Sequence, residues 1–371
     1  MKSLWNRLAR AIIRIRFKLF RLMSIIFLGR ECGQSIIGQC VVTDLEFANT
    51  ESARRLILER KPISEACVQT YDLKDVPDCW RAMFSRCAVF PKRYAYLLQD
   101  VAIGPESGVM FAPSSRRLKG DGMIFVPSIG HHYFLFQCGI QEVMRSPKPI
   151  DDDTPLCPMP VIGYYHDLLE GLLHVVIAIK SFENVKVIVP ERRPRYIDDM
   201  LDFIGLERGR IIASDRPVLA KRAALVPRWS DCGENLRGDI SEFARFLVGK
   251  LPVEHSGADK LYISRLKSRR SIPNEREVER VLGKQGFRVA YFEEMPFSEQ
   301  LLAMRSAKVI VAPHGAALAN LIAANPDSKV VEIMTQGWAN CCYGHLASSL
   351  GIDYTCVDAD DEDLVQRLSA L

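Results

Sequence analysis

The sequence predicts an α/β fold in which two Rossmann-like units face each other across a cleft. Short apolar strands alternate with segments of helical period from residue 164 onward, and the alternation pauses over 252–259 before it restarts. Alternating helices and apolar strands are typical of parallel sheets, and a pause between two such runs indicates a linker. A length of 371 residues also suits two domains of ordinary size.

The positive charge is concentrated at the N-terminus. Of the 49 Lys and Arg residues, eight lie in residues 1–30, which contain no Asp or Glu. The rest of the chain therefore has 41 basic residues against 45 acidic ones. A body with this balance is not expected to bind a polyanion, so nucleic acid is not an expected partner.

Residues 1–29 have the pattern of a basic amphipathic helix. An apolar stripe runs from Leu4 to Ile26, and arginines and lysines lie beside it. Because charges interrupt the apolar residues every few positions, neither a secretory signal nor a membrane-spanning helix is predicted. Such a helix suits an anionic membrane interface; the alternative is that it docks on the protein's own core or on a partner. We expect a cytoplasmic protein held peripherally on the inner face of the cell membrane.

No metal or cofactor is expected. The eleven cysteines form no CxxC pair, which indicates free thiols in a reducing compartment. The acidic clusters at 151–153 and 358–363 fall in predicted loop or terminal contexts, where charges are usually solvated.

The first α/β unit is assigned to residues 30–250. Its early part shows only strand-like fragments at 66–71 and 86–90, and the proline-rich stretch 146–160 predicts a loop. The later pattern predicts helices over 164–182, 196–204 and 241–250, and strands over 185–190, 210–214 and 223–228.

The second unit is assigned to residues 251–371. Apolar runs predict strands over 260–264, 287–292, 308–312, 329–333 and 354–357. Helical periods predict helices over 275–284, 299–306, 316–323 and 343–350. Ligands of open α/β sheets bind beyond the carboxyl ends of the strands, so the candidate residues are sought there.

The stretch VIVAPHGAALANLI at 309–322 predicts a strand that turns through small residues into a helix. Gly315 and Ala316 would let a ligand approach the backbone, and the helix N-terminus would favour an anion such as a diphosphate. His314 could donate to a phosphate. The alternative is a tight turn with a structural histidine.

A basic loop follows the strand over 260–264. Arg265 and Arg269 are candidate phosphate ligands, because a guanidinium can hold two phosphate oxygens at once. Asn274, with Glu277 three residues later, fits a helix N-cap and capping box as well as a ligand contact. A solvated basic loop is the alternative.

Two further positions carry acidic side chains in apolar surroundings. Glu332 lies inside the strand KVVEIM and needs a partner there, either ribose hydroxyls or a protein group. His166 and Glu170 are four residues apart on one helical face, where the carboxylate can orient the imidazole as a general base. Asp167 is a third candidate base, and a buried structural histidine is the alternative.

Several of these motifs together resemble glycosyltransferase family 61. They are YISR, the Asn-Glu helix start in IPNEREV, the Glu-Gln in MPFSEQ and the run PHGAALAN, and GYYHDLLEGL is similar to the family's histidine-containing helix. The resemblance covers roughly residues 160–357. It implies a GT-B fold and an inverting enzyme of the bacterial capsular polysaccharide type.

The resemblance also implies roles for the candidate residues. Positions of its donor-binding signature are matched by Arg265, His314, Gly315, Ala316, Asn320 and Glu332. The acceptor is expected to face His166 and Glu170. Asp167 stands where many members of the family carry a bulky aromatic residue, so the identity of the base stays open.

The expected function is transfer of a sugar from a nucleotide-sugar donor to a cell-surface polysaccharide or a lipid-linked glycan. Basic groups and main-chain N–H donors can offset the charge of the departing diphosphate without a metal. The alternatives are another enzyme that processes nucleotide sugars, and a non-catalytic glycan assembly protein at the membrane.

Overall fold

A computed structural model describes residues 56–71, 84–90, 92–111, 145–227, 237–252, 257–268, 270–335 and 340–369, with a few gaps and isolated positions. The isolated positions 73, 76–77, 124–125, 142 and 371 are also described. The predicted amphipathic helix over 1–29 and the candidate Arg269 lie outside the described residues.

The first sheet has nine strands in the order β10-β9-β8-β11-β4-β5-β6, with β1 paired to β4 and β7 to β11. Its strands are β1 (Ile57–Ser64), β4 (Arg93–Ile103), β5 (Met110–Phe111), β6 (Ile124–Phe125), β7 (Lys148–Pro149), β8 (Leu156–Pro158), β9 (Lys186–Pro190), β10 (Ile211–Ser214) and β11 (Val218–Leu225). β9 and β10 are parallel as predicted, and β8 also runs parallel to β9, but β11 pairs antiparallel with β4. The sheet is therefore mixed. Its strands β1 and β4 come from the part of the chain for which the sequence predicted only strand-like fragments.

The predicted loop over 146–160 contains two strands, so that prediction is wrong in part. β8 is fully buried and pairs in parallel with β9, from Leu156 opposite Lys186 to Pro158 opposite Ile188. The prolines are tolerated because they stand beside or at the end of a three-residue strand, where few ladder hydrogen bonds are lost.

The helices of this part of the chain are α7 (Tyr164–His166), the π-helical η2 (Asp167–Leu172), α8 (Leu173–Ser181), α9 (Arg195–Phe203), the short η3 (Arg208–Arg210) and α10 (Arg237–Val248). The first three run on without interruption and confirm the helix predicted over 164–182. Its middle is a π-helix, a form that is rare and often found at functional sites. All six residues of that π-helical stretch are buried.

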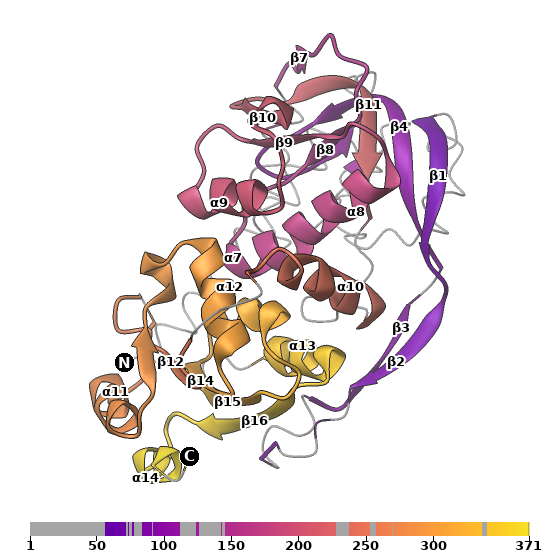
Figure 1. The fold of residues 1–371 in the computed structure, drawn as a ribbon. Coiled ribbons are helices and arrows are strands. Elements are labelled where there is room, and N and C mark those ends of the chain that lie inside the picture. The colour runs from indigo at the N-terminus through magenta and orange to yellow at the C-terminus, as the bar shows by residue number, and fades with distance from the viewer. Residues whose placement is uncertain are drawn as a thin grey trace, which may run out of the picture.

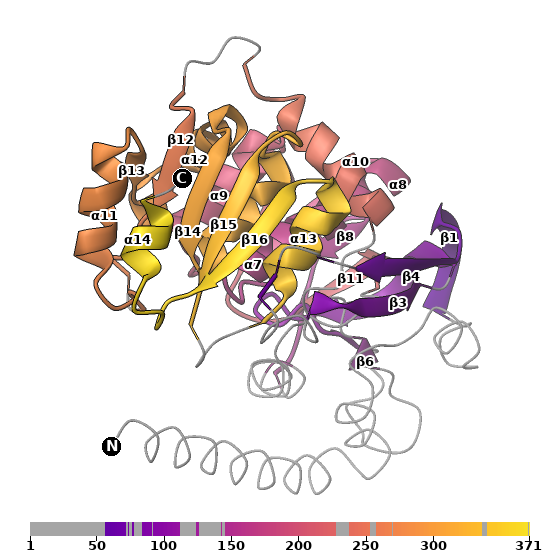
Figure 2. The same ribbon diagram turned by 90° about the horizontal axis from the view of Figure 1, so that it is seen from below.

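The second sheet has five parallel strands in the order β13-β12-β14-β15-β16, and each of them lies where the sequence predicted a strand (Figure 2). They are β12 (Lys260–Ile263), β13 (Arg288–Ala290), β14 (Val309–Pro313), β15 (Lys329–Met334) and β16 (Asp353–Asp358). The helices are α11 (Glu275–Lys284), η4 (Phe292–Glu294), α12 (Phe297–Ser306), η5 (Ala316–Ala323), α13 (Cys342–Leu350) and α14 (Leu364–Leu368).

The helices of both parts form a shared layer between the two sheets (Figure 1). One apolar cluster joins Leu168 and Leu172 of the first part to Leu318 and Leu346 of the second. A separate cluster on the far face of the second sheet packs α11 and α14 against its strands. The two sheets are thus held at a fixed separation by buried helices, and the candidate residues lie along this layer.

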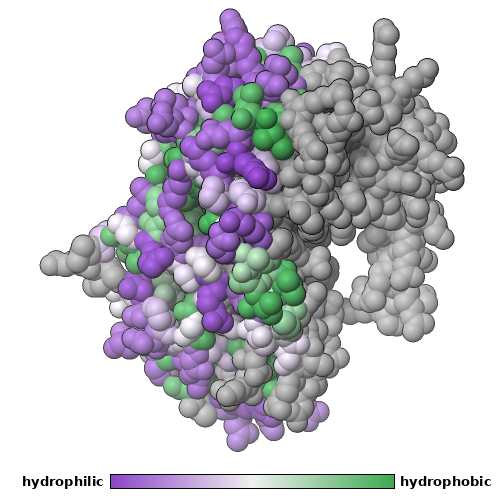
Figure 3. All heavy atoms as spheres, turned by 90° about the vertical axis from the view of Figure 1, so that its right-hand side faces the viewer, coloured by the Kyte–Doolittle hydropathy of each residue, from purple (hydrophilic) through white to green (hydrophobic). Residues whose placement is uncertain are grey.

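A two-stranded ribbon, β2 (Cys67–Tyr71) and β3 (Arg86–Phe90), reaches across to the second part, where Tyr71 stacks on His345 of α13 with ring centroids 4.2 Å apart. Its outer face carries Val68 directly opposite Val89, and both are exposed. Figure 3 views the molecule from the side of this ribbon and shows apolar residues among hydrophilic ones. In the portion of the chain that is described, no helix has the length and apolar character to cross a membrane.

Candidate active site

The second sheet has a topological switch point between β12 and β14. Its order places the first strand, β12, between the second and the third, so the chain leaves β12 and β14 toward opposite neighbours. Crevices for ligands open at such points, beyond the carboxyl ends of the strands. The loops that begin there carry Ser264 and Arg265 after β12, and His314 and Gly315 after β14. The structure therefore brings together residues that are 49 positions apart in sequence.

Arg265 links the two loops. Its Nε donates to Ser268 Oγ at 3.1 Å, and a terminal nitrogen donates to the main-chain carbonyl oxygen of His314. Burial, followed by the neighbouring charge of Arg270, lowers the pKa of Arg265 below its ordinary value. The carboxylates of Glu275 and Glu293 act in the opposite direction, but neither forms an ion pair with Arg265. A phosphate bound beside Arg265 would supply a closer negative charge.

Gly315 is small because Arg265 occupies the space beside it. A Cβ on Gly315 would lie 2.8 Å from Cζ of Arg265 and 3.1 Å from its Nε. The glycine backbone is extended, with φ 176°, so no unusual conformation requires it. The prediction that Gly315 gives close access is therefore refined: the side chain that comes close to it is that of Arg265.

The helix predicted after this turn forms as a 3₁₀-helix, η5. Ala316 and Ala317 are half-buried and line a cavity, as small residues at its entrance should. A 3₁₀-helix has poorer hydrogen-bond alignment than an α-helix, so the predicted dipole contribution to anion binding is reduced.

Glu275 holds the Arg265 loop in place. Its buried carboxylate accepts hydrogen bonds from the main-chain N–H groups of Arg265 and Ile272, at 3.0 Å for the latter. It also accepts from the hydroxyls of Ser264 and Tyr262, at 3.2 and 3.3 Å. A buried carboxylate with four donors is well satisfied. The motif Asn-Glu was predicted only as a helix start, so this role of Glu275 was missed.

The capping box predicted at Asn274 does not form. Asn274 does stand at the N-cap of α11, but with φ 55° it is left-handed and its side chain makes no capping hydrogen bond. Glu277 instead pairs with Arg280. Asn274 is exposed and does not line the cavity described below. The neighbouring residue Glu275 instead holds the loop, through its hydrogen bonds to the main chain of Arg265 and Ile272.

His314 is oriented by Glu332. The carboxylate of Glu332 is completely buried, accepts a hydrogen bond from His314 Nδ1, and accepts a second from the Tyr354 hydroxyl at 2.5 Å. Because a carboxylate can only accept, Nδ1 of His314 carries the proton. His314 Nε2 lies 3.4 Å from Asn340 Nδ2. The partners of Glu332 are therefore protein groups, which is the alternative to the predicted ribose contact.

His166 and Glu170 form the predicted pair. Nδ1 of His166 lies 3.0 Å from Glu170 Oε2, and both side chains are buried. The same reasoning places a proton on Nδ1, so that Nε2 is the basic nitrogen of the ring. This contact suits a general base and equally suits the alternative of a buried structural histidine, and neither His166 nor Glu170 lines the cavity described below.

Asp167 is occupied by structural partners. Its Oδ1 accepts from the main-chain N–H groups of Ile162 and Gly163, at 2.8 and 3.2 Å, and its Oδ2 accepts from the Tyr196 hydroxyl at 2.7 Å. Burial raises the pKa of Asp167, while these hydrogen bonds act in the opposite direction. The carboxylate ties the start of the helix to the preceding loop and to α9.

A row of rings connects the two histidines. The Tyr165 ring meets the ring of His166 edge-on with centroids 5.1 Å apart, and meets Tyr343 of α13 at 5.7 Å. The Tyr343 ring lies 5.1 Å from that of His314. Two buried tyrosines, Tyr165 and Tyr343, therefore stand between His166 and His314, and the sequence pattern singled out neither of them.

Asn320 has a buried structural position. Its Nδ2 donates to Gln300 Oε1 and to the carbonyl oxygen of Ala317, both at 3.0 Å. The Tyr164 hydroxyl lies 2.8 Å from both Gln300 Oε1 and Asn320 Oδ1. Asn320 thereby fixes η5 to α12 and joins both to the helix that begins at Tyr164.

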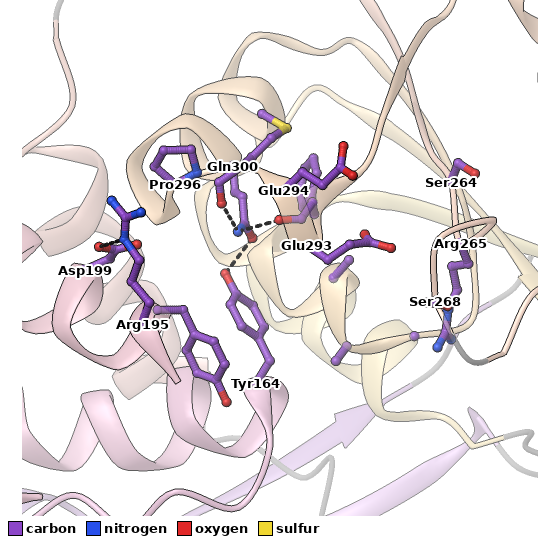
Figure 4. Close-up of a pocket in the computed structure, with 16 residues that line it drawn as sticks. Tyr164, Arg195, Asp199, Ser264, Arg265, Ser268, Glu293, Glu294, Pro296 and Gln300 are labelled. Atoms are coloured by element: carbon purple, nitrogen blue, oxygen red, sulfur yellow. Dashed lines mark hydrogen bonds and ion pairs between the residues drawn. The ribbon is translucent and has the colours of Figure 1, made fainter. Parts of the chain in front are cut away.

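A cavity of about 510 Å³ opens between the two parts of the chain at these residues. One wall comes from the first part and the other from the second, and Figure 4 shows them facing each other. The lining residues used below are Tyr164, Arg195, Arg265, Glu293, Glu294 and Gly315. The volume lies within the usual range for small-molecule sites.

The acidic cluster at 151–153 is paired with lysines. Asp151 and Asp153 contact Lys221 at 2.8 and 3.2 Å, and the hydrogen bond from Lys186 lowers the pKa of Asp152 to about 2. Within the described residues no group of three or more His, Cys, Asp or Glu side chains is placed to hold a metal ion.

The fold and site define an α/β protein with a ligand-sized cavity, an arginine at the switch point of the second sheet, and two histidines that each contact a buried carboxylate. The sequence profile described as Glycosyltransferase 61 matches residues 124–331, more than half of the chain. The chain belongs to glycosyltransferase family 61 and is a glycosyltransferase.

A plant glycosyltransferase is similar to this chain over a short stretch. The β-1,2-xylosyltransferase RCN11 of Oryza sativa subsp. japonica is 31% identical over 83 residues. The matched stretch is 21% of this chain and 16% of that protein, so the chain covers only a small part of its length.

Proposed function

We propose that this glycosyltransferase transfers a sugar with inversion from a nucleotide-sugar donor to a hydroxyl of a cell-surface polysaccharide or a lipid-linked glycan. The two α/β parts would act as the halves of a GT-B enzyme. The observation that carries the proposal is the position of Arg265: it lies half-buried at the switch point and lines a cavity whose other wall belongs to the first part.

The donor diphosphate would lie against Arg265 and the main chain at Gly315. Charge grows on the diphosphate as the glycosidic bond to the sugar breaks, so a positive charge fixed in advance stabilises the transition state more than the ground state. The main-chain carbonyl of His314 and Ser268 already hold the guanidinium in place. Transfer is expected to persist in a chelator, since Arg265 supplies the positive charge that a metal would otherwise bring.

The acceptor would be activated by His166. Its Nε2 takes the proton of the attacking hydroxyl, while Glu170 holds Nδ1–H and stabilises the positive charge that forms on the ring. The oxygen then forms a bond to the anomeric carbon from the face opposite the diphosphate. Asp167 is the less suitable base, because both of its oxygens already accept hydrogen bonds within the protein.

Transfer assays test the proposal. The purified protein is incubated with a panel of labelled nucleotide sugars and with membrane lipid extract, and the anomeric configuration of the product is read by NMR. Labelled glycan with inverted configuration is expected, together with its loss in His166→Ala. Conversion of the donor without an acceptor would instead indicate a different nucleotide-sugar enzyme, and donor binding without any transfer would indicate a glycan assembly protein.

The cellular site is proposed from the sequence of residues 1–29 alone. A basic amphipathic segment would bring the enzyme to the anionic inner face of the cell membrane, where lipid-linked acceptors are found. Deleting residues 1–29 is expected to release the protein from membranes in a flotation assay. Retention of the shortened protein would contradict this part of the proposal.

A further inference from the structure

Glu293 places an exposed carboxylate in the wall of the cavity. It belongs to η4, which follows β13 directly, and it lines the cavity together with Glu294. Both carboxylate oxygens of Glu294 accept from Lys267 Nζ, at 2.8 and 2.7 Å. Glu293 has no hydrogen bond or ion pair to any residue that the structure describes. Figure 4 shows its side chain pointing toward the side of the cavity where Ser264 and Arg265 lie.

The position of Glu293 in the sheet is informative. β13 lies beside β12, with Ala290 opposite Ile263. Arg265 follows Ile263 by two residues and Glu293 follows Ala290 by three, so both project from the same edge of the sheet. In doubly wound sheets that bind nucleotides, an acidic residue at the end of the strand beside the phosphate loop accepts a hydrogen bond from ribose.

The other acidic candidate for this contact is already engaged. Glu332 is completely buried, and its two oxygens accept from His314 and Tyr354. It does not line the cavity, whereas Glu293 does. Of Glu293 and Glu332, the carboxylate that can reach a ligand in the cavity is therefore that of Glu293.

We propose that Glu293 accepts hydrogen bonds from the 2′- and 3′-hydroxyls of a ribose whose diphosphate lies at Arg265. This inference rests on the proposed function and narrows it: the donor is a ribonucleoside-diphosphate sugar and not a deoxythymidine-diphosphate sugar. A 2′-deoxyribose lacks one donor and leaves the carboxylate partly unpaired in the complex, so the site discriminates against it.

Calorimetric titration with nucleoside diphosphates tests the inference. The ligands are UDP, GDP, ADP and CDP, each compared with its 2′-deoxy form, on the full-length wild-type protein. We expect at least one ribonucleotide to bind about ten- to hundredfold more tightly than its deoxy form, as for a hydrogen bond to a charged group. Glu293→Gln should reduce this ratio to about threefold or less, because a neutral amide is a weaker partner for the hydroxyls.

Glu294→Gln is the matched control, because it removes a neighbouring charge from the same cavity wall. It should keep the wild-type ratio. Equal binding of ribo and deoxy ligands by the wild type would overturn the role of Glu293 and leave the proposed function standing. The same holds if Glu293→Gln keeps the discrimination or if Glu294→Gln abolishes it equally. Failure of every nucleotide to bind would overturn the proposed function itself.

Discussion

The guanidinium of Arg265 donates a hydrogen bond to the main-chain carbonyl oxygen of His314 and thereby joins the two loops at the switch point of the second sheet. The same carbonyl precedes Gly315, whose missing side chain leaves room for the guanidinium. The arginine and the glycine, two motifs that lie far apart in the sequence, therefore form one structural unit.

Arg265→Lys is expected to weaken donor binding. A lysine keeps the charge but cannot hold Ser268, the His314 carbonyl and a phosphate in one planar arrangement. The donor Kd should rise about 10- to 100-fold, the value of one or two charge-assisted hydrogen bonds. Calorimetry with nucleoside diphosphates measures this. The control is Lys267→Ala, which removes an exposed cation of the same loop and should change Kd by less than about threefold.

Gly315→Ala is expected to impair activity without unfolding the protein. The new Cβ displaces the flexible end of Arg265, so kcat/KM should fall about tenfold or more while the melting temperature changes little. The effect should not add to that of Arg265→Lys, because both act on one guanidinium. Gly283→Ala is the control: nothing lies within 4 Å of its Cβ, and it should leave kcat/KM unchanged. Full activity of Gly315→Ala would contradict the arrangement.

His166→Ala is expected to lower kcat about 10²- to 10⁴-fold, the usual contribution of a general base. Donor Kd should stay close to wild type, because His166 does not line the donor cavity. Glu170→Gln should give a smaller loss in kcat, since the amide can still orient the ring but does not stabilise its charge. Steady-state kinetics with calorimetry separates the two quantities. A variant that loses donor affinity and keeps kcat would argue against the assigned role.

Asp167→Asn should change the pH dependence of stability more than the rate. Because burial raises the folded-state pKa of Asp167 above its ordinary value of 3.8, the native state binds this proton more tightly than the unfolded chain. Its contribution to the free energy of unfolding is therefore favourable at low pH and is lost as pH rises from about 3.8 through the raised pKa.

The variant cannot titrate at that position, so the comparison isolates the group. Urea unfolding between pH 4 and 8 should show Asp167→Asn gaining stability relative to wild type as pH rises. Other buried acids such as Glu142 and Asp239 are present in both proteins and cancel in the difference. A pH-independent difference would contradict the assignment, and a kcat loss as large as that of His166→Ala would restore Asp167 as the base.

The second sheet could be predicted strand by strand because its central strands β12, β14 and β15 are buried along most of their length and read as short apolar runs. The strands of the first sheet that were missed have different patterns. β1 is mostly exposed or half-exposed and contains three charged residues, and β8 is only three residues long and ends in proline. Their stability comes from pairing with strands distant in sequence, which local periodicity does not record.

The contacts of the site that are local in sequence could be predicted, whereas those between distant segments could not. His166 and Glu170 are one helical turn apart, so their contact follows from local geometry. The roles of Glu275 and Tyr343 depend on which distant segments the fold brings to them. Glu275 accepts hydrogen bonds from a loop that precedes its helix. Tyr343 lies between the ring of Tyr165, from the first part of the chain, and the ring of His314, from the second. Such contacts are set by tertiary structure alone.

The Tyr164 hydroxyl, held between the amides of Gln300 and Asn320, has a mechanical consequence. Tyr164 belongs to the first part of the chain, whereas both amides come from helices of the second. One hydroxyl group therefore pins three helices to one another at the wall of the cavity. A ligand that enters there meets a wall that is shaped in advance, so less conformational entropy is lost when it binds.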